Sequence, residues 1–151
     1  MALASDEVHH LPGWSPKPMF SKMYSGYLDA TPPGEDVKMH MHYIFIECED
    51  PDPRKPVLVW SNGGPGAASE FGLFTELGPY TLSEASLLTK EYNATGIPSL
   101  YRNPFSWTRV ANVLIYDSPP PVGFSYCNNN ITGDGYSCGA PLRTMSSNCP
   151  F

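Results

Sequence analysis

The stretch that decides the fold is PVLVWSNGGPGAASEFGLFTELGP, residues 56–79. It starts with the continuous apolar run PVLVW, which is typical of a central strand covered by helices on both faces. A glycine-rich loop follows, and after it SEFGLFTEL places Phe71, Phe74 and Leu77 at helical spacing before Gly-Pro ends the helix. A strand, a glycine loop and a helix in this order indicate an α/β fold.

Further strand patterns lie on both sides of this unit. NVLIYDSP, residues 112–119, contains a second continuous apolar run, Val113 to Tyr116, and predicts a buried strand that ends in Asp-Ser-Pro. Upstream, MYSGYLD (residues 23–29) and the alternating segment at residues 37–47 are separated by the turn sequence TPPGED, residues 31–36. We expect these two segments to pair as an antiparallel hairpin.

Composition limits the classes of function. The chain has 151 residues, with 9 Lys+Arg against 15 Asp+Glu and a net charge of −6. No Lys/Arg cluster is present, which excludes nucleic acid as a partner, and the longest apolar runs are four residues, which is too short to span a membrane. The 13 Gly and 17 Pro, together with 41% hydrophobic residues, predict a loop-rich globular chain of one domain or part of one.

Other features point to the secretory pathway. Asn93-Ala94-Thr95 and Asn130-Ile131-Thr132 both match the N-glycosylation pattern. The first ten residues contain no apolar stretch that resembles a signal peptide. We nevertheless expect a vacuolar, lysosomal or extracellular location. The four cysteines allow either disulfides, of which a Cys127–Cys138 pair would close a short loop, or four unpaired thiols: Cys48, Cys127, Cys138 and Cys149.

The glycine loop WSNGGPGAAS is the most informative candidate site. Gly63 and Gly64 follow a predicted buried strand and have no side chains that would block a ligand. Two backbone N–H groups at such a strand end can point at an anion. The alternative is an ordinary tight turn, which NGG alone would indicate.

The motifs of this chain resemble, in one consistent order, those of the serine carboxypeptidase family. The resemblance rests on WSNGGPG, SEFGLFTELGP and NPFSWTRVANVLIYDSPPPVGFSY, supported upstream by LPGW and YSGYLDA, and covers about residues 11–126. It implies the N-terminal, incomplete part of an α/β-hydrolase fold, in which a mostly parallel central sheet carries an antiparallel N-terminal hairpin. The expected organisation is an irregular arm at residues 1–18, a partial peptidase domain at 19–139 and an unrelated tail at 140–151.

The resemblance also implies roles for individual residues. The family releases C-terminal residues from peptides with a serine nucleophile and needs neither a cofactor nor a metal. Gly64 matches the donor of an oxyanion-hole N–H, and Gly63 belongs to the same loop. Asn62 matches the residue that binds the terminal carboxylate of the substrate, and Glu76 matches an acidic member of that hydrogen-bonded network. Trp60 is expected to belong to the same substrate-binding group.

Three catalytic groups of the family have no match in this chain. The family carries its nucleophile in a GESYAG elbow downstream of GFSY, with the Asp and His of the triad further on, and none of these is found. All the histidines precede the glycine loop: His9, His10, His40 and His42. The chain is therefore expected to be inactive alone, and peptide substrates are expected only for a full-length form. The alternative is a non-catalytic glycoprotein module that binds or regulates, for which a full-length relative is a candidate partner.

Three other patterns are interpreted as structural. Ser137 lies in GYSCG, which fits G-x-S-x-G, but no strand pattern precedes it and no helix pattern follows it. His40 and His42 share one strand face, and we expect them to face solvent rather than to hold a metal with His9 or His10. Asp117 closes a buried strand, where it could be read as a catalytic acid, but the resemblance to the family motif implies a structural strand-end residue that binds loop N–H groups.

Overall fold

The computed structural model describes residues 4–14, 18–50, 52–64, 66–128 and 138. Asn130, Ser137, Cys149 and the predicted tail at 140–151 lie outside the described residues.

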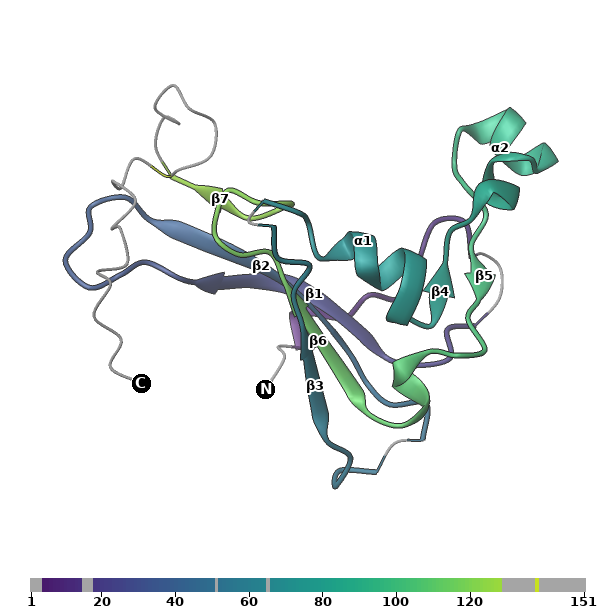
Figure 1. Cartoon of the computed structure of the whole chain (residues 1–151), viewed down its shortest axis with the longest axis horizontal. Coiled ribbons are helices and arrows are strands. Elements are labelled where there is room, and N and C mark those ends of the chain that lie inside the picture. Colours follow the sequence, from purple (N-terminus) through teal and green to yellow (C-terminus); the bar gives the residue numbers. More distant parts are fainter. Residues whose placement is uncertain (1–3, 15–17, 51, 65, 129–137, 139–151) are drawn as a thin grey trace.

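The main sheet confirms the expected α/β class and has the strand order β1-β2-β6-β3, with β7 paired to β2 (Figure 1). The strands are β1 (Met23–Asp29), β2 (Met39–Ile46), β3 (Val57–Trp60), β6 (Asn112–Tyr116) and β7 (Tyr126–Cys127). β1 and β2 form the predicted antiparallel hairpin, with Met23 opposite Ile46. β6 runs antiparallel to β2 and parallel to β3, so the described part of the sheet is mixed and contains one parallel pair.

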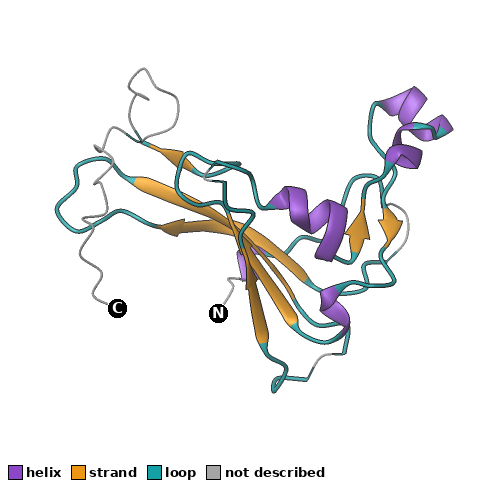
Figure 2. Cartoon of the chain, in the orientation of Figure 1, coloured by secondary structure: helices purple, strands orange, loops and turns teal. Residues whose placement is uncertain are grey.

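Short elements complete the described structure. They are η1 (Ala4–Asp6), α1 (Glu70–Gly72), the π-helical η2 (Leu73–Leu77), β4 (Tyr80–Thr81), η3 (Glu84–Leu87), α2 (Lys90–Thr95), β5 (Tyr101–Arg102) and η4 (Trp107–Arg109). β4 and β5 form a separate two-stranded sheet beside α1, and α2 lies at its far end (Figure 2). In the part of the chain with assigned structure, no helix is both long and apolar enough to cross a membrane.

One face of the main sheet packs on the helix that follows the glycine loop. The predicted helix at residues 69–77 is confirmed as α1 and η2, but Phe71 is 65% exposed and contributes nothing to the core. Leu77 is buried as expected, and Leu73 is buried in place of Phe71, because one turn of the π-helical segment brings Leu73 and Leu77 to the same face. They join a core cluster with sheet and flanking residues: Trp14, Met23, Ile44, Ile46, Tyr80, Val113 and Ile115.

β3 occupies the edge of the described sheet. The prediction of a strand covered on both faces is wrong here, since Val57 is 52% and Val59 56% exposed. The reason is the strand order, in which β6 lies between β2 and β3. The face opposite the helix carries a shallow apolar hollow of about 530 Å³ lined by residues of β1, β2, β3 and β6, among them Tyr24, Phe45 and Leu114.

The N-terminal segment also contributes to the core. Trp14 is 5% exposed and packs on Phe20 and Tyr80, with ring centroids 5.1 and 4.9 Å apart. The Val8 N–H donates to the carbonyl oxygen of Met23 at 2.8 Å, so this segment pairs antiparallel with the edge of β1. Residues predicted as an irregular arm thus close one side of the hydrophobic cluster.

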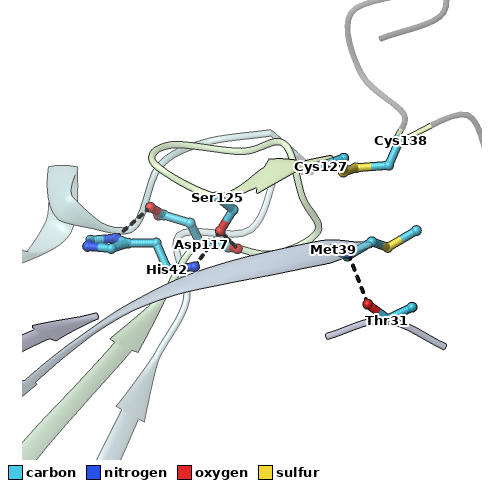
Figure 3. The surroundings of a disulfide bond; sticks show 7 residues. All are labelled: Thr31, Met39, His42, Asp117, Ser125, Cys127 and Cys138. Carbon is cyan, nitrogen blue, oxygen red and sulfur yellow. Dashed lines mark hydrogen bonds and ion pairs between the residues drawn. A yellow bond between two sulfur atoms is a disulfide. The ribbon is translucent and has the colours of Figure 1, made fainter. Parts of the chain in front are cut away.

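Of the two cysteine states considered, the disulfide between Cys127 and Cys138 is present, whereas Cys48 is a buried free thiol. The disulfide lies next to β7, and β7 pairs with Met39 and His40 at the start of β2 (Figure 3). It therefore fastens Cys138 to β7 at the end of the main sheet.

Candidate functional site

The glycine loop at the end of β3 exposes backbone donors. Gly63 and Gly64 have φ angles of +73° and +116°, a region that side-chain-bearing residues rarely adopt. Both residues are exposed, and neither N–H donates a hydrogen bond to any described residue. The loop thus leaves two adjacent backbone donors available to an anionic ligand, as the sequence predicts.

One hydrogen bond orients the side-chain amide of Asn62, and its NH₂ group donates to no described residue. The indole N–H of Trp60 donates to Asn62 Oδ1 at 2.7 Å, and an indole nitrogen can only donate. This contact fixes the amide orientation and leaves the Asn62 NH₂ group for an external acceptor such as a carboxylate. Gly72 permits the arrangement, because a Cβ there would come within 2.6 Å of both Asn62 Oδ1 and Trp60 Nε1.

Glu76 forms no hydrogen bond with Asn62 or Trp60 in the described structure. Its side chain is exposed, and its carboxylate makes no hydrogen bond or ion pair with a described residue. Only its main-chain carbonyl is engaged, accepting from Asn103 Nδ2 at 2.7 Å. A network that joins Glu76 to Asn62 stays a prediction.

Asp117 anchors the C-terminal end of the glycine loop. Its side chain is fully buried, and its Oδ1 accepts from the Ser69 N–H at 2.9 Å. Its Oδ2 accepts from the Phe124 N–H at 3.1 Å. Ser69 Oγ in turn donates to the Tyr116 carbonyl at 2.8 Å. It also accepts from the backbone N–H of Asn62 at 3.4 Å. Asp117 therefore binds loop N–H groups, as predicted, and connects them to Asn62.

His42 lies beneath this anchor, where the expectation of a solvent-facing histidine is wrong. It is 6% exposed, and Figure 3 shows its ring turned toward Asp117. Its Nδ1 lies 3.3 Å from Asp117 Oδ2 and 2.9 Å from Glu70 Oε1, while its Nε2 lies 2.9 Å from Ser25 Oγ. Alternation along β2 cannot show that α1 covers this face, so sequence reasoning missed both the burial and Glu70.

These three groups alter one another's protonation. Burial opposes the charged form of His42, but the carboxylates of Glu70 and Asp117 outweigh it and raise the pKa of His42. Burial raises the pKa of Asp117, and Glu70 raises it further. Burial would raise the pKa of Glu70 as well, but His42 and Asp117 hold that pKa below its ordinary value. Negative charge on the two carboxylates thus favours a positive charge on the imidazole.

The remaining candidate residues do not join this site. Among the described residues, the His, Cys, Asp and Glu side chains that lie close enough together to hold one metal ion are His42, Glu70 and Asp117. His9 is paired with Glu7 at 3.9 Å instead. Asn93 of the first sequon is exposed on α2.

We predict that Gly123→Ala destabilises the chain by disturbing the Asp117 anchor. Gly123 has a φ angle of +55°, and a Cβ there would overlap the Asp117 carboxylate. We expect the free energy of unfolding to fall by about 2–3 kcal/mol, since overpacking and left-handed strain add. Urea unfolding monitored by tryptophan fluorescence measures the change.

The control is Gly96→Ala, at a φ angle of +73°, where an added Cβ would meet nothing within 4 Å. This variant has the backbone strain without the overlap, and its free energy of unfolding should fall by about 1 kcal/mol. Equal losses in the two variants would show that Asp117 does not restrict the space around Gly123.

Most of the chain is similar in sequence to one family of proteins. Residues 12–139 match the family model described as serine carboxypeptidase. The chain is 42% identical over 126 residues to the lysosomal protective protein of Mus musculus, covering 83% of this chain and 23% of that protein. It is 44% identical over 117 residues to serine carboxypeptidase-like 20 of Arabidopsis thaliana, covering 76% and 22%. For serine carboxypeptidase ctsa-3.1 of Caenorhabditis elegans the identity is 42% over 131 residues, covering 87% and 20%.

A solved structure shares the fold. The prohormone-processing carboxypeptidase Kex1(Δ)p of Saccharomyces cerevisiae superposes with a TM-score of 0.63 at 24% identity, covering 83% of this chain and 26% of that chain. The chain spans 20–23% of the length of the three curated relatives named above.

Proposed function

The chain belongs to the serine carboxypeptidase family, and we propose that it supplies the oxyanion loop and part of the carboxylate-binding site of a serine-type carboxypeptidase. One observation carries the proposal: the N–H groups of Gly63 and Gly64 and the NH₂ group of Asn62 all remain unused by described residues at the end of β3. These are neutral donors beside one another, as a site for a peptide C-terminus and a developing oxyanion requires.

The chemistry divides between the two kinds of donor. The Gly64 N–H stabilises negative charge that develops on the carbonyl oxygen when a nucleophile attacks the scissile bond. The Asn62 NH₂ group binds the terminal carboxylate and so positions the last peptide bond over the loop. Trp60 acts through Asn62, because its indole N–H fixes the orientation of the amide.

We propose that the nucleophile and its base come from sequence other than these 151 residues. No histidine follows the glycine loop in the sequence, and GYSCG lacks a preceding strand pattern. The purified chain should therefore show no turnover of an N-blocked dipeptide. Turnover that a serine-directed inhibitor abolishes would contradict this part of the proposal.

A chimera tests the site itself. Residues 12–127 of this chain would replace the matching segment of the Caenorhabditis elegans serine carboxypeptidase, which is 42% identical over 131 residues. We expect the chimera to release the C-terminal residue of N-blocked dipeptides. A chimera that folds, by circular dichroism and a cooperative thermal transition, yet has no activity would favour the non-catalytic module.

In this chimera, Asn62→Ala should lower kcat/KM by about 10–100-fold, because a hydrogen bond to a charged carboxylate is lost. Steady-state kinetics with a dipeptide and with its C-terminal amide measure the effect. The loss should be confined to the free-carboxylate substrate. An equal loss on the amide would contradict carboxylate binding by Asn62.

We also propose passage through the secretory pathway, which the exposed position of Asn93 on α2 supports. Expressed with a secretion leader in an insect cell, the chain should lose mass on treatment with an N-glycosidase. Asn93→Gln should remove one glycan, which mass spectrometry of the tryptic peptide would detect. An unmodified Asn93 in secreted material would contradict the proposal.

A further inference from the structure

Three metal-ligating side chains from distant parts of the sequence meet below the glycine loop. His42 comes from β2, Glu70 from the first residue of α1, and Asp117 from the position just after β6. Their ligand atoms all lie within 4.8 Å of one another. The side chains of His42, Glu70 and Asp117 are only 8%, 13% and 0% exposed.

The charges of this cluster are not balanced by hydrogen bonds. Both carboxylate oxygens of Glu70 are buried, and neither accepts a hydrogen bond of good geometry from a described residue. Glu70 Oε1 lies 2.9 Å from His42 Nδ1, but that nitrogen is within hydrogen-bond geometry of Asp117 instead. Neither carboxylate forms an ion pair with a Lys or Arg among the described residues. Two buried carboxylates therefore share one imidazole, so the cluster is neutral only with a further cation or with a proton on one carboxylate.

The donor set and its spacing suit a divalent transition metal. Imidazole nitrogen and carboxylate oxygen are ligands of Zn²⁺ at about 2.0–2.2 Å, so two donors on a tetrahedral ion lie roughly 3.4 Å apart. The observed separations from His42 Nδ1 are 2.9 Å to Glu70 and 3.3 Å to Asp117. Small movements of flexible side chains would accommodate an ion between them.

Outer groups already orient two of the three ligands. Ser25 Oγ lies 2.9 Å from His42 Nε2, which leaves Nδ1 to face the cluster. The N–H groups of Ser69 and Phe124 donate to the two oxygens of Asp117. Such partners set the tautomer of a ligating histidine and the orientation of a ligating carboxylate in metal sites.

We propose that His42, Glu70 and Asp117 bind one divalent transition-metal ion of the zinc class. The ion ties β2, α1 and the chain after β6 together, and through the Asp117–Ser69 hydrogen bond it holds the glycine loop. The role is structural, and it does not depend on the proposed peptidase function. Sequence reasoning predicts no metal because Glu70 is not near His42 or Asp117 in sequence.

The test uses the 151-residue chain, purified in EDTA and dialysed. Isothermal titration with ZnCl₂ at pH 7 should give about one ion per chain. Zinc at about 100 times its Kd should raise Tm by roughly 5 °C or more relative to EDTA. The quantity compared between variants is this zinc-minus-EDTA shift, so differences in stability without metal cancel.

The variants separate this site from adventitious binding. Glu70→Gln and His42→Asn should each lose the shift in Tm. The exposed N-terminal histidines are the matched control, and the His9→Gln/His10→Gln double variant should keep the full shift. Co²⁺ added to the unmutated chain should give the visible absorption of a four-coordinate site, which requires no variant to fold.

Any one of the following results would overturn the inference. An unmutated chain whose Tm does not respond to zinc binds no metal at this cluster. A shift retained in Glu70→Gln, or lost in the His9→Gln/His10→Gln variant, places the ion elsewhere. A cobalt spectrum typical of six-coordinate binding at the surface would also place the ion elsewhere.

Discussion

Asp117→Ala is expected to lower the free energy of unfolding of the chain by about 3–5 kcal/mol. The carboxylate is fully buried and accepts from the N–H groups of Ser69 and Phe124, and it faces His42. Its removal leaves one buried and one partly buried backbone donor without acceptors and a histidine without one of its counter-charges. Guanidinium unfolding in EDTA, followed by tryptophan fluorescence and circular dichroism, measures the loss free of any metal contribution.

Two controls isolate the cause. Asp117→Asn keeps one acceptor oxygen and nearly the same volume, so it should lose less than the alanine variant. Asp52→Ala removes a partly exposed carboxylate that pairs with the exposed Arg54, and its unfolding midpoint should stay nearly unchanged. If Asp117→Ala unfolds at the same denaturant concentration as the parent chain, the anchor contributes nothing to stability.

Gly64→Ala in the chimera is expected to lower kcat by about 10²–10³-fold. Gly64 has a φ angle of +116°, and a Cβ there would lie 3.2 Å from the Gly66 nitrogen. The loop must rearrange to accept alanine, which turns the N–H away from the oxyanion. Because this interaction forms only in the transition state, kcat and kcat/KM should fall together while KM stays nearly constant.

Gly34→Ala provides the matched control for Gly64→Ala. Gly34 also has a positive φ angle, +84°, but lies in the turn before β2 with nothing within 4 Å of an added Cβ. The chimera with this change should keep its kcat. A rise in KM alone for Gly64→Ala, with kcat preserved, would show that the loop does not stabilise the oxyanion.

Local patterns predict the elements well. MYSGYLD corresponds residue for residue to β1, and the strand–loop–helix order around the glycines is as expected. These features follow from alternation, apolar runs and glycine clusters within short windows. The burial of Leu73 in place of Phe71 follows from the π-helical turn, which an ordinary helical period does not anticipate.

Tertiary placement is where sequence reasoning falls short. The pattern of PVLVW fits burial on both faces, yet its exposure depends on which strands flank it. His42 and Glu70 meet only because α1 crosses the β2 face, and no local pattern reports that contact. The role of Asp117 is predictable because the resemblance to the family motif implies a structural residue at the strand end that binds loop N–H groups.

The strand order has a consequence for synthesis of the chain on the ribosome. The β1–β2 hairpin joins neighbouring segments and can form as soon as both have left the exit tunnel. β3 is made before β6 but pairs only with it in the described sheet, so it must wait, extended and unpaired, until residue 116 has emerged. Long-range parallel pairing of this kind is slow and exposes apolar strands in the interval. The glycine loop, attached to β3, therefore takes its shape late in translation, and chaperones that bind extended apolar segments have their best opportunity during that wait.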